Sequence, residues 1–215
     1  MLRDDVDRVQ LGADSTRRRM RLAVQVGLLR PFLRSQLDLT VGGLSSLEGL
    51  KAPFILVANH SSDIDTAVVF GTMPPGLACR LATGAATDRF FVSKRKSFAP
   101  RLFFNIYPVD RPGHVRVGDN RGLSKELLLA DVPLLIFPEG TRRNTNGLGR
   151  FSTGPARMGA AMSVPCVPIA LLGTRLAMPI GAKRPVSGRP RVHVEYGAPM
   201  VARRGEPAVL FSRRL

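Results

Sequence analysis

The sequence predicts an α/β fold: a single domain with a mixed, mostly parallel sheet flanked by helices. Apolar runs of strand length, such as residues 53–58 and 132–137, alternate along the chain with segments of helical pattern. The 215 residues suffice for one domain with a sizeable core. Neither an internal repeat nor a linker splits that domain, so we separate only a basic N-terminal segment, residues 1–40, from the remainder, residues 41–215.

The elements are expected in a regular order. After a polar start at residues 1–16, a helix opens with Arg17–Arg21 and forms its apolar side from Leu22, Val26, Leu29 and Leu33. Next come an extended segment or short hairpin at 37–51, a strand at 53–58, a helix at 62–73, a strand at 77–83, a two-part helix at 88–105 and a strand at 106–109. A helix at 114–130, a strand at 132–137, a helix at 153–163 and strands at 164–172 and 191–196 follow, with loops at 139–152 and 173–190.

The charge balance is strongly basic, with 32 Lys+Arg against 16 Asp+Glu and a formal net charge of +16. A field of this sign attracts nucleic acid, anionic lipid or a phosphorylated substrate. With two Tyr and no Trp, few aromatic side chains are available to stack on bases, and zinc-finger and RNA-recognition signatures are absent. We therefore expect no nucleic-acid partner. The basic helix either contacts an anionic membrane surface or packs on the domain with its arginines in solvent.

Targeting signals and cysteines restrict the cellular location and the kinds of site that the chain can form. No apolar run reaches the ~18 residues of a membrane-spanning helix, and the start at Met1–Asp5 is too acidic for a secretory signal. These features predict a peripheral protein on the cytoplasmic face of a membrane. Cys79 and Cys166 lie in apolar stretches without Cys-x-x-Cys spacing, so we expect two buried, reduced thiols and no metal site.

A histidine and an aspartate follow the strand expected at 53–58. On one continuous helix, His60 and Asp65 would lie about 140° out of phase and would not meet. If His60 lies in the loop before the helix and Asp65 in its first turn, the imidazole can fold back onto the carboxylate. Such a pair can take a proton from a hydroxyl near neutral pH. The alternative is a capping box with Ser62 as N-cap and a purely structural Asp65.

Two more strands run into polar turns. Residues 137–142 offer the carboxylate of Glu139, the flexible Gly140, the hydroxyl of Thr141 and the guanidinium of Arg142, and backbone amides and arginine bind phosphate well. Asp110 and Arg111 end a third strand in the same way. The alternatives are an ordinary turn with solvated arginines and a local surface ion pair. Because no Gly-x-Ser-x-Gly elbow is present, the histidine would activate a substrate hydroxyl directly, through a ternary complex.

Taken together, these segments resemble the glycerophospholipid acyltransferases, the 1-acylglycerol-3-phosphate acyltransferase superfamily. Residues 59–65 are similar to its His-x4-Asp motif, 107–111 (Tyr-Pro-Val-Asp-Arg) to its second motif, 137–142 (Phe-Pro-Glu-Gly-Thr-Arg) to its third and 164–169 to its fourth. Order and spacing agree over roughly residues 45–200. The chain departs from the pattern at 151–154, where Phe-Ser-Thr-Gly stands in place of Phe-Lys-x-Gly, and a C-terminal helix common in relatives would be short or absent.

The resemblance implies an acyltransferase domain at 41–215 that moves a fatty acyl group from acyl-CoA or acyl-carrier protein to a hydroxyl of a lysophospholipid or glycerol phosphate. His60 would be the general base and Asp65 its orienting partner. The acceptor's phosphate and polar head would be held by Arg111, Glu139, Gly140, Thr141 and Arg142. Beyond the co-substrate no cofactor or metal is expected, because thiolate is a competent leaving group. An acyltransferase with a non-phosphate acceptor, such as an ornithine lipid or glycolipid, and a non-enzymatic basic protein that binds membrane or nucleic acid are the alternatives.

Overall fold

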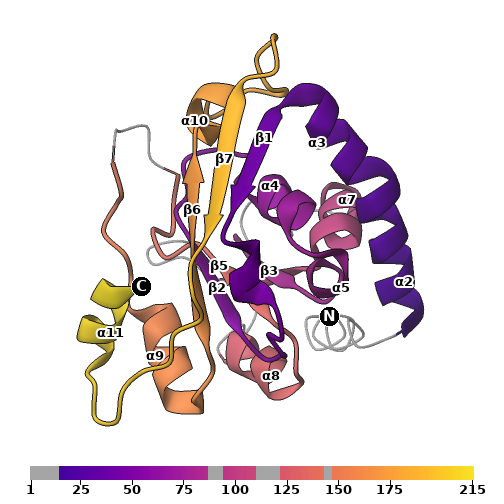
Figure 1. Cartoon of the computed structure of the whole chain (residues 1–215). Helices are drawn as coiled ribbons and strands as arrows, with labels where there is room; N and C mark the ends of the chain where they lie inside the picture. Colours follow the sequence, from indigo (N-terminus) through magenta and orange to yellow (C-terminus); the bar gives the residue numbers. More distant parts are fainter. Residues whose placement is uncertain (1–14, 87–93, 110–121, 143–146) are drawn as a thin grey trace.

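The computed structural model describes residues 15–86, 94–109, 122–142 and 147–215. Within them a seven-stranded sheet has the order β1-β7-β6-β2-β5-β3-β4 (Figure 1). The strands are β1 (Asp38–Gly42), β2 (Ile55–Ala58), β3 (Ala82–Ala86), β4 (Ile106–Val109), β5 (Leu134–Ile136), β6 (Cys166–Leu172) and β7 (Arg191–Tyr196). Every neighbouring pair is parallel except β6 and β7, which are antiparallel. The predicted mixed, mostly parallel sheet is therefore confirmed.

Helices cover both faces of this sheet (Figure 1). One face carries α2 (Ser15–Val24), the π-helical turn η2 (Gln25–Leu29), α3 (Arg30–Gln36), α4 (Asp65–Thr72), α5 (Pro75–Ala78) and α7 (Lys94–Phe104). The other carries α8 (Leu123–Leu129), α9 (Gly154–Met162) and α11 (Ala208–Arg214), while η3 (Leu44–Leu47) and α10 (Thr174–Ala177) are short connections. Strand β2 supplies side chains alternately to the two cores, which is why residues 53–58 are a continuous apolar run.

Several expected elements are corrected by the structure. The hairpin alternative for 37–51 is wrong, because β1 pairs in parallel with β7. A strand does not begin at Leu77: Pro75 starts the helical turn α5, and β3 begins only at Ala82. The loop expected at 173–190 contains α10, and the seven-residue α11 is the short C-terminal helix. Of the helix expected at 114–130, the first part lies outside the described residues and the rest is α8.

The side of the long N-terminal helix that faces the domain differs from the side expected from the sequence. Its side facing the domain is a row of residues four apart, Arg21, Gln25, Leu29, Leu33 and Leu37. Leu22 is half-buried and Val26 is exposed, so the predicted apolar side is wrong in its first half. In a regular α-helix a row of this spacing drifts by about 40° per turn. The π-helical turn η2 has more residues per turn, so it compensates for this rotation and the whole row continues to face the domain.

Buried polar contacts attach this helix to the domain. The Arg21 guanidinium donates hydrogen bonds to the Cys79 carbonyl (2.8 Å) and to Asn105 Oδ1 (3.0 Å), and burial lowers the pKa of Arg21 to about 10. Gln25 donates to the Phe103 carbonyl at 2.7 Å. The helix therefore packs on the domain along one side, as one of the two alternatives predicted, but the expectation that its arginines lie in solvent is wrong for Arg21. Cys79 and Cys166 are buried and unpaired, also as predicted.

Candidate active site

The loop after β2 brings His60 and Asp65 together. Strands β2, β5 and β6 run in the same direction, so their carboxyl ends meet at one edge of the sheet, where this loop lies. His60 Nδ1 is 2.9 Å from Asp65 Oδ2. A carboxylate only accepts hydrogen bonds, so Nδ1 is the donor, and in the neutral imidazole Nε2 keeps a free lone pair. The His60 side chain is 20% exposed and Asp65 is fully buried, which leaves the histidine as the member of the pair that a substrate can reach.

Backbone groups hold the Asp65 carboxylate in place. Its Oδ2 atom also accepts hydrogen bonds from the N–H groups of Ser61 (2.7 Å) and Ser62 (2.8 Å). Helix α4 begins at Asp65, where a negative charge interacts favourably with the helix dipole. The N-cap residue is Ile64, so the expectation that Ser62 caps the helix is wrong. Asp65 nevertheless reaches back to the Ser62 N–H as in a capping box, so one carboxylate both stabilises the turn and orients the imidazole.

Glu139 supports the same loop from the neighbouring strand junction. Its Oε1 atom accepts a hydrogen bond from the backbone N–H of His60 (2.8 Å), and Oε2 accepts one from the N–H of Gly149 (2.9 Å). The Phe137 ring stacks on the His60 imidazole with centroids 4.2 Å apart. The family resemblance implied that Glu139 binds the acceptor, and its contact with the His60 backbone was not predicted. The adjacency of β2 and β5 in the sheet is what creates it.

The remaining predicted binding residues lie at the turn after β5. Arg142 forms an ion pair with Asp63, both about four-fifths buried, and Asp63 also accepts a hydrogen bond from the Gly181 N–H at 3.4 Å. Gly140 adopts φ +71°, which glycine favours, and Gly140 and Thr141 are exposed. Arg111 lies outside the described residues. The structure thus brings His60, Asp65, Glu139 and the Asp63–Arg142 pair to one edge of the sheet.

Two further residues hold the His60 loop, one through a contact with β6 and one through a contact with the end of α10, and neither role was predicted from the sequence. The Asn59 side-chain amide donates to the Leu171 carbonyl (2.9 Å) and accepts from the Leu171 N–H (2.7 Å), which continues the strand pairing beyond β2. The Ser62 hydroxyl donates to the Met178 carbonyl at 2.6 Å. Because such bonds depend on segments more than 100 residues apart, local sequence patterns carry no signal for them.

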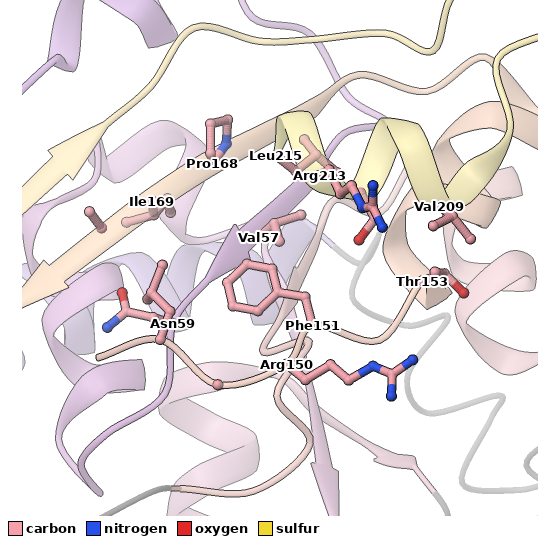
Figure 2. A pocket seen from close by; sticks show the side chains of 14 residues that line it. Val57, Asn59, Arg150, Phe151, Thr153, Pro168, Ile169, Val209, Arg213 and Leu215 are labelled. Carbon is pink, nitrogen blue, oxygen red and sulfur yellow. The ribbon is translucent and has the colours of Figure 1, made fainter. Parts of the chain in front are cut away.

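A largely apolar pocket of about 520 Å³ adjoins this loop at Asn59. It is lined from β2, β6, α11 and the segment 148–153. Figure 2 shows the Phe151 ring close to Val57, with Arg150 and Arg213 extending toward the same side of the pocket. Its size is within the usual range of small-molecule sites. An apolar chain that carries a negative or polar group suits this combination of lining residues.

A buried carboxylate, an oriented histidine and a neighbouring arginine at the carboxyl edge of an α/β sheet form an arrangement that can take a proton from the hydroxyl of a polar substrate. The family model described as Acyltransferase matches residues 38–172, well over half of the chain, and the chain belongs to this family. The resemblance drawn from the sequence motifs is therefore confirmed.

Individual relatives agree with this family assignment. The chain is 31% identical to the 1-acyl-sn-glycerol-3-phosphate acyltransferase of Chlamydomonas reinhardtii over 151 residues, 66% of this chain and 41% of that protein. It is 28% identical to the chloroplastic 1-acyl-sn-glycerol-3-phosphate acyltransferase BAT2 of Brassica napus over 153 residues, 71% of this chain and 41% of that protein. The chain thus spans less than half the length of these relatives. The crystal structure of the 1-acyl-sn-glycerophosphate acyltransferase PlsC from Thermotoga maritima has the same fold, with a TM-score of 0.63 at 18% identity over 90% of this chain and 76% of that one.

Proposed function

We propose that the chain transfers a fatty acyl group from a thioester, either acyl-CoA or acyl-carrier protein, to a hydroxyl of lysophosphatidate or glycerol phosphate. The observation that carries this proposal is the His60–Asp65 contact of 2.9 Å, with the carboxylate fully buried and anchored by two backbone N–H groups. The names of the relatives support the acceptor, because they are acyltransferases of 1-acyl-sn-glycerol 3-phosphate.

In this mechanism the acceptor hydroxyl lies at Nε2 of His60. Its oxygen attacks the thioester carbonyl carbon while its proton passes to Nε2. The tetrahedral intermediate then collapses, the carbon–sulfur bond breaks, and the imidazolium returns the proton to the departing thiolate. The Asp65 carboxylate stabilises the imidazolium between these two steps. No enzyme-bound acyl group forms, so both substrates must be bound together.

The acceptor's phosphate is assigned to the turn after β5. Arg142 would exchange its Asp63 partner for a phosphate oxygen, and Arg111 would supply a second guanidinium. The Thr141 hydroxyl and the backbone at Gly140 are exposed at the same turn and complete this part of the proposal. The acyl chain is assigned to the pocket of Figure 2, whose lining is apolar next to the His60 loop.

An assay of the purified protein tests the proposal. Lysophosphatidate, glycerol phosphate, an ornithine lipid and a glycolipid are offered as acceptors, each with acyl-CoA and with acyl-carrier protein, and acylated products are measured by mass spectrometry. Acylation of a phosphate-bearing acceptor, abolished in a folded His60→Ala variant, is expected. Transfer only to acceptors without phosphate would instead identify the alternative acyltransferase, and product formation that survives His60→Ala would contradict the assignment of the base.

We also propose that the outer side of the N-terminal helix contacts an anionic membrane. Among the described residues, no helix has the length and apolar character needed to cross a bilayer. Several large apolar side chains are nevertheless about half exposed on α2–η2–α3: Met20, Val26, Leu28 and Phe32. The exposed residues Arg17–Arg19 adjoin them. This combination favours a helix that lies in the membrane interface.

Point substitutions test this contact better than deletion of the helix. Leu29, Leu33 and Leu37 belong to the core, so a chain without this segment would lose stability as well as its membrane surface. A Leu28→Ser/Phe32→Ser variant should sediment less with anionic vesicles, and added salt should weaken binding of the parent chain. Leu129→Ser, an exposed position on α8 over the other face of the sheet, is the matched control. Unchanged sedimentation of the double variant would contradict the proposed surface.

A further inference from the structure

A second pocket, of about 390 Å³, lies between α3, β1 and the end of α4. The residues assigned to acyl transfer do not line it. Its apolar lining comes from Leu33, Leu37, Leu39 and Met73, and its basic lining comes from Arg30, Arg34 and Arg189. The pocket therefore combines an apolar floor with three guanidinium groups from two separate segments of the chain.

The three arginines converge on the pocket. Arg30 and Arg34 lie one turn apart on α3 and so project from the same side of the helix. Arg30 donates to the Met73 carbonyl, which holds its guanidinium at the pocket, while its Nε is buried without a hydrogen-bond partner. Arg189 comes from the loop before β7 and donates to the Leu37 carbonyl at 3.4 Å. Two of the three side chains are thus fixed by backbone contacts.

The positive charge of this pocket is only partly offset by the surrounding protein, because one carboxylate lines it beside three arginines. Burial, and next the charge of Arg34, lower the pKa of Arg30, as expected for neighbouring cations. Among the described residues, no carboxylate forms an ion pair with Arg30, Arg34 or Arg189. The one acidic residue that lines the pocket, Asp38, lies 3.7 Å from Arg191. Three cations around one pocket repel each other unless an anion binds between them.

Exposed apolar side chains adjoin these arginines. Phe32 and Leu28 are 51% and 62% exposed on the outward side of the same helix. At the other end of the pocket Val41 and Leu44 are 36% and 38% exposed. A free phosphate ion would leave this apolar surface in water. An amphiphile with a phosphate group would cover it and neutralise the arginines at the same time.

We propose that this pocket is a second lipid site, which binds the phosphate of an anionic membrane phospholipid separately from the acceptor site at His60. Arg30, Arg34 and Arg189 donate charge-assisted hydrogen bonds to the phosphate oxygens. The glycerol and the acyl chains of the lipid lie against the exposed apolar side chains beside the arginines, Phe32, Val41 and Leu44. The site would hold the enzyme on the bilayer in a fixed orientation and does not depend on acyl transfer being the activity.

Vesicle binding by the full chain tests the site. Phosphatidylcholine vesicles with and without phosphatidylglycerol are titrated with the parent chain, with Arg34→Gln/Arg189→Gln and with a control, Arg157→Gln/Arg204→Gln. The control removes the same charge from exposed positions on α9 and before α11. Loss of charge-assisted hydrogen bonds should lower the affinity for anionic vesicles by about tenfold or more in the pocket variant. Much less change is expected in the control, and phosphatidylcholine alone should not distinguish the three proteins.

Further measurements distinguish a lipid phosphate from a soluble phosphate and check that the variants are folded. Equal weakening in the pocket and control variants would show a diffuse charge effect and overturn the proposal. Glycerol phosphate is also titrated alone. If it binds the parent chain as tightly as anionic vesicles do and does not bind the pocket variant, the pocket is a site for soluble phosphate, and the proposal of a lipid site is overturned as well. Single Arg34→Gln, at an exposed position, replaces the double variant if thermal melting shows a folding defect. Acylation of dispersed lysophosphatidate should be unchanged in the pocket variant, which keeps this test separate from that of the catalytic proposal.

Discussion

The junctions after β2 and β5 look alike in sequence, and the structure gives them different tasks. Both are apolar strands that run into polar turns, and they lie side by side in parallel register. After β2 the chain presents His60, partly exposed and oriented by a buried carboxylate. After β5 it presents Glu139, whose two carboxylate oxygens are bonded to backbone N–H groups of His60 and Gly149.

The difference between Asp65 and Glu139 explains this division. Asp65 holds a side chain, and Glu139 holds the backbone that carries that side chain. A reacting group needs orientation at both levels, because a small displacement of a catalytic group is costly in rate. In the proposed mechanism, one junction would therefore supply the chemistry and the other would support it.

The largest effect should come from the base itself. His60→Ala removes the proton acceptor, and general-base catalysis typically contributes about 10²- to 10⁴-fold, so kcat should fall by that range. His193→Ala, at a partly exposed position on β7, is the matched control and should retain its turnover. Steady-state kinetics with a thermal melt of each variant decide the outcome. A folded His60→Ala enzyme with parental kcat would remove His60 from the mechanism.

Asp65→Asn should be nearly as severe. The amide oxygen can still accept the hydrogen bonds that Oδ2 accepts, but the negative charge that stabilises the imidazolium is lost. We expect kcat to fall by about 10²-fold or more, with the acceptor's KM little changed. Glu126→Gln, an exposed position on α8, controls for the loss of one negative charge. A larger change in KM than in kcat would argue for the structural role alone.

Glu139→Ala sharpens the comparison between the junctions. Two backbone N–H groups would lose their acceptor, so the His60 loop should shift and kcat should fall by about 10- to 100-fold. Glu139→Gln keeps one acceptor oxygen and should lie between the parent and Glu139→Ala. If KM for the acceptor rises while kcat stays constant, Glu139 binds the acceptor, as the family resemblance implied, and does not position the base.

The smallest effect is expected from replacing the arginines, and it should appear in the binding of the acceptor. A charge-assisted hydrogen bond contributes about 1.5–3 kcal/mol, so Arg142→Ala or Arg111→Ala should raise the acceptor's KM by about tenfold or more. The acyl donor's KM should not change, and Arg157→Ala, exposed on α9, is the control for lost charge. Measuring both KM values at saturating co-substrate checks this. If only the acyl donor's KM rises, these arginines bind the donor and not the acceptor.

Local patterns were sufficient for the fold class and for the His60–Asp65 contact. A strand within 53–58 and a helix within 62–73 follow from apolar runs and turn residues, although α4 begins at Asp65 and not at residue 62. The pair is only five residues apart. Its distance of 2.9 Å confirms the predicted geometry, while the catalytic role stays a prediction. The hairpin at 37–51 was wrong because nothing in that segment shows that its partner strand is β7.

Contacts between distant segments were beyond such patterns. Glu139 binds the His60 backbone only because β5 is next to β2, an order set by the whole sheet. The burial of Arg21 depends on the π-helical turn at 25–29, where the hydrophobic spacing alone favoured Leu22 and Val26. Tertiary packing determined both, and it overrode the local preference of the chain.

That wide turn also sets how the helix tolerates changes in length. A π-helical turn accommodates one residue more than an α-helical turn, so the segment 25–29 contains a spare residue. Gly27 is exposed, and a side chain placed there would meet no other atom. Deleting it would let an ordinary α-turn form while Arg21 and Gln25 keep facing the domain. A deletion in the α-helical parts on either side, 15–24 or 30–36, would rotate one end of the helix against the other, so we expect the segment 25–29 to tolerate the loss of one residue best.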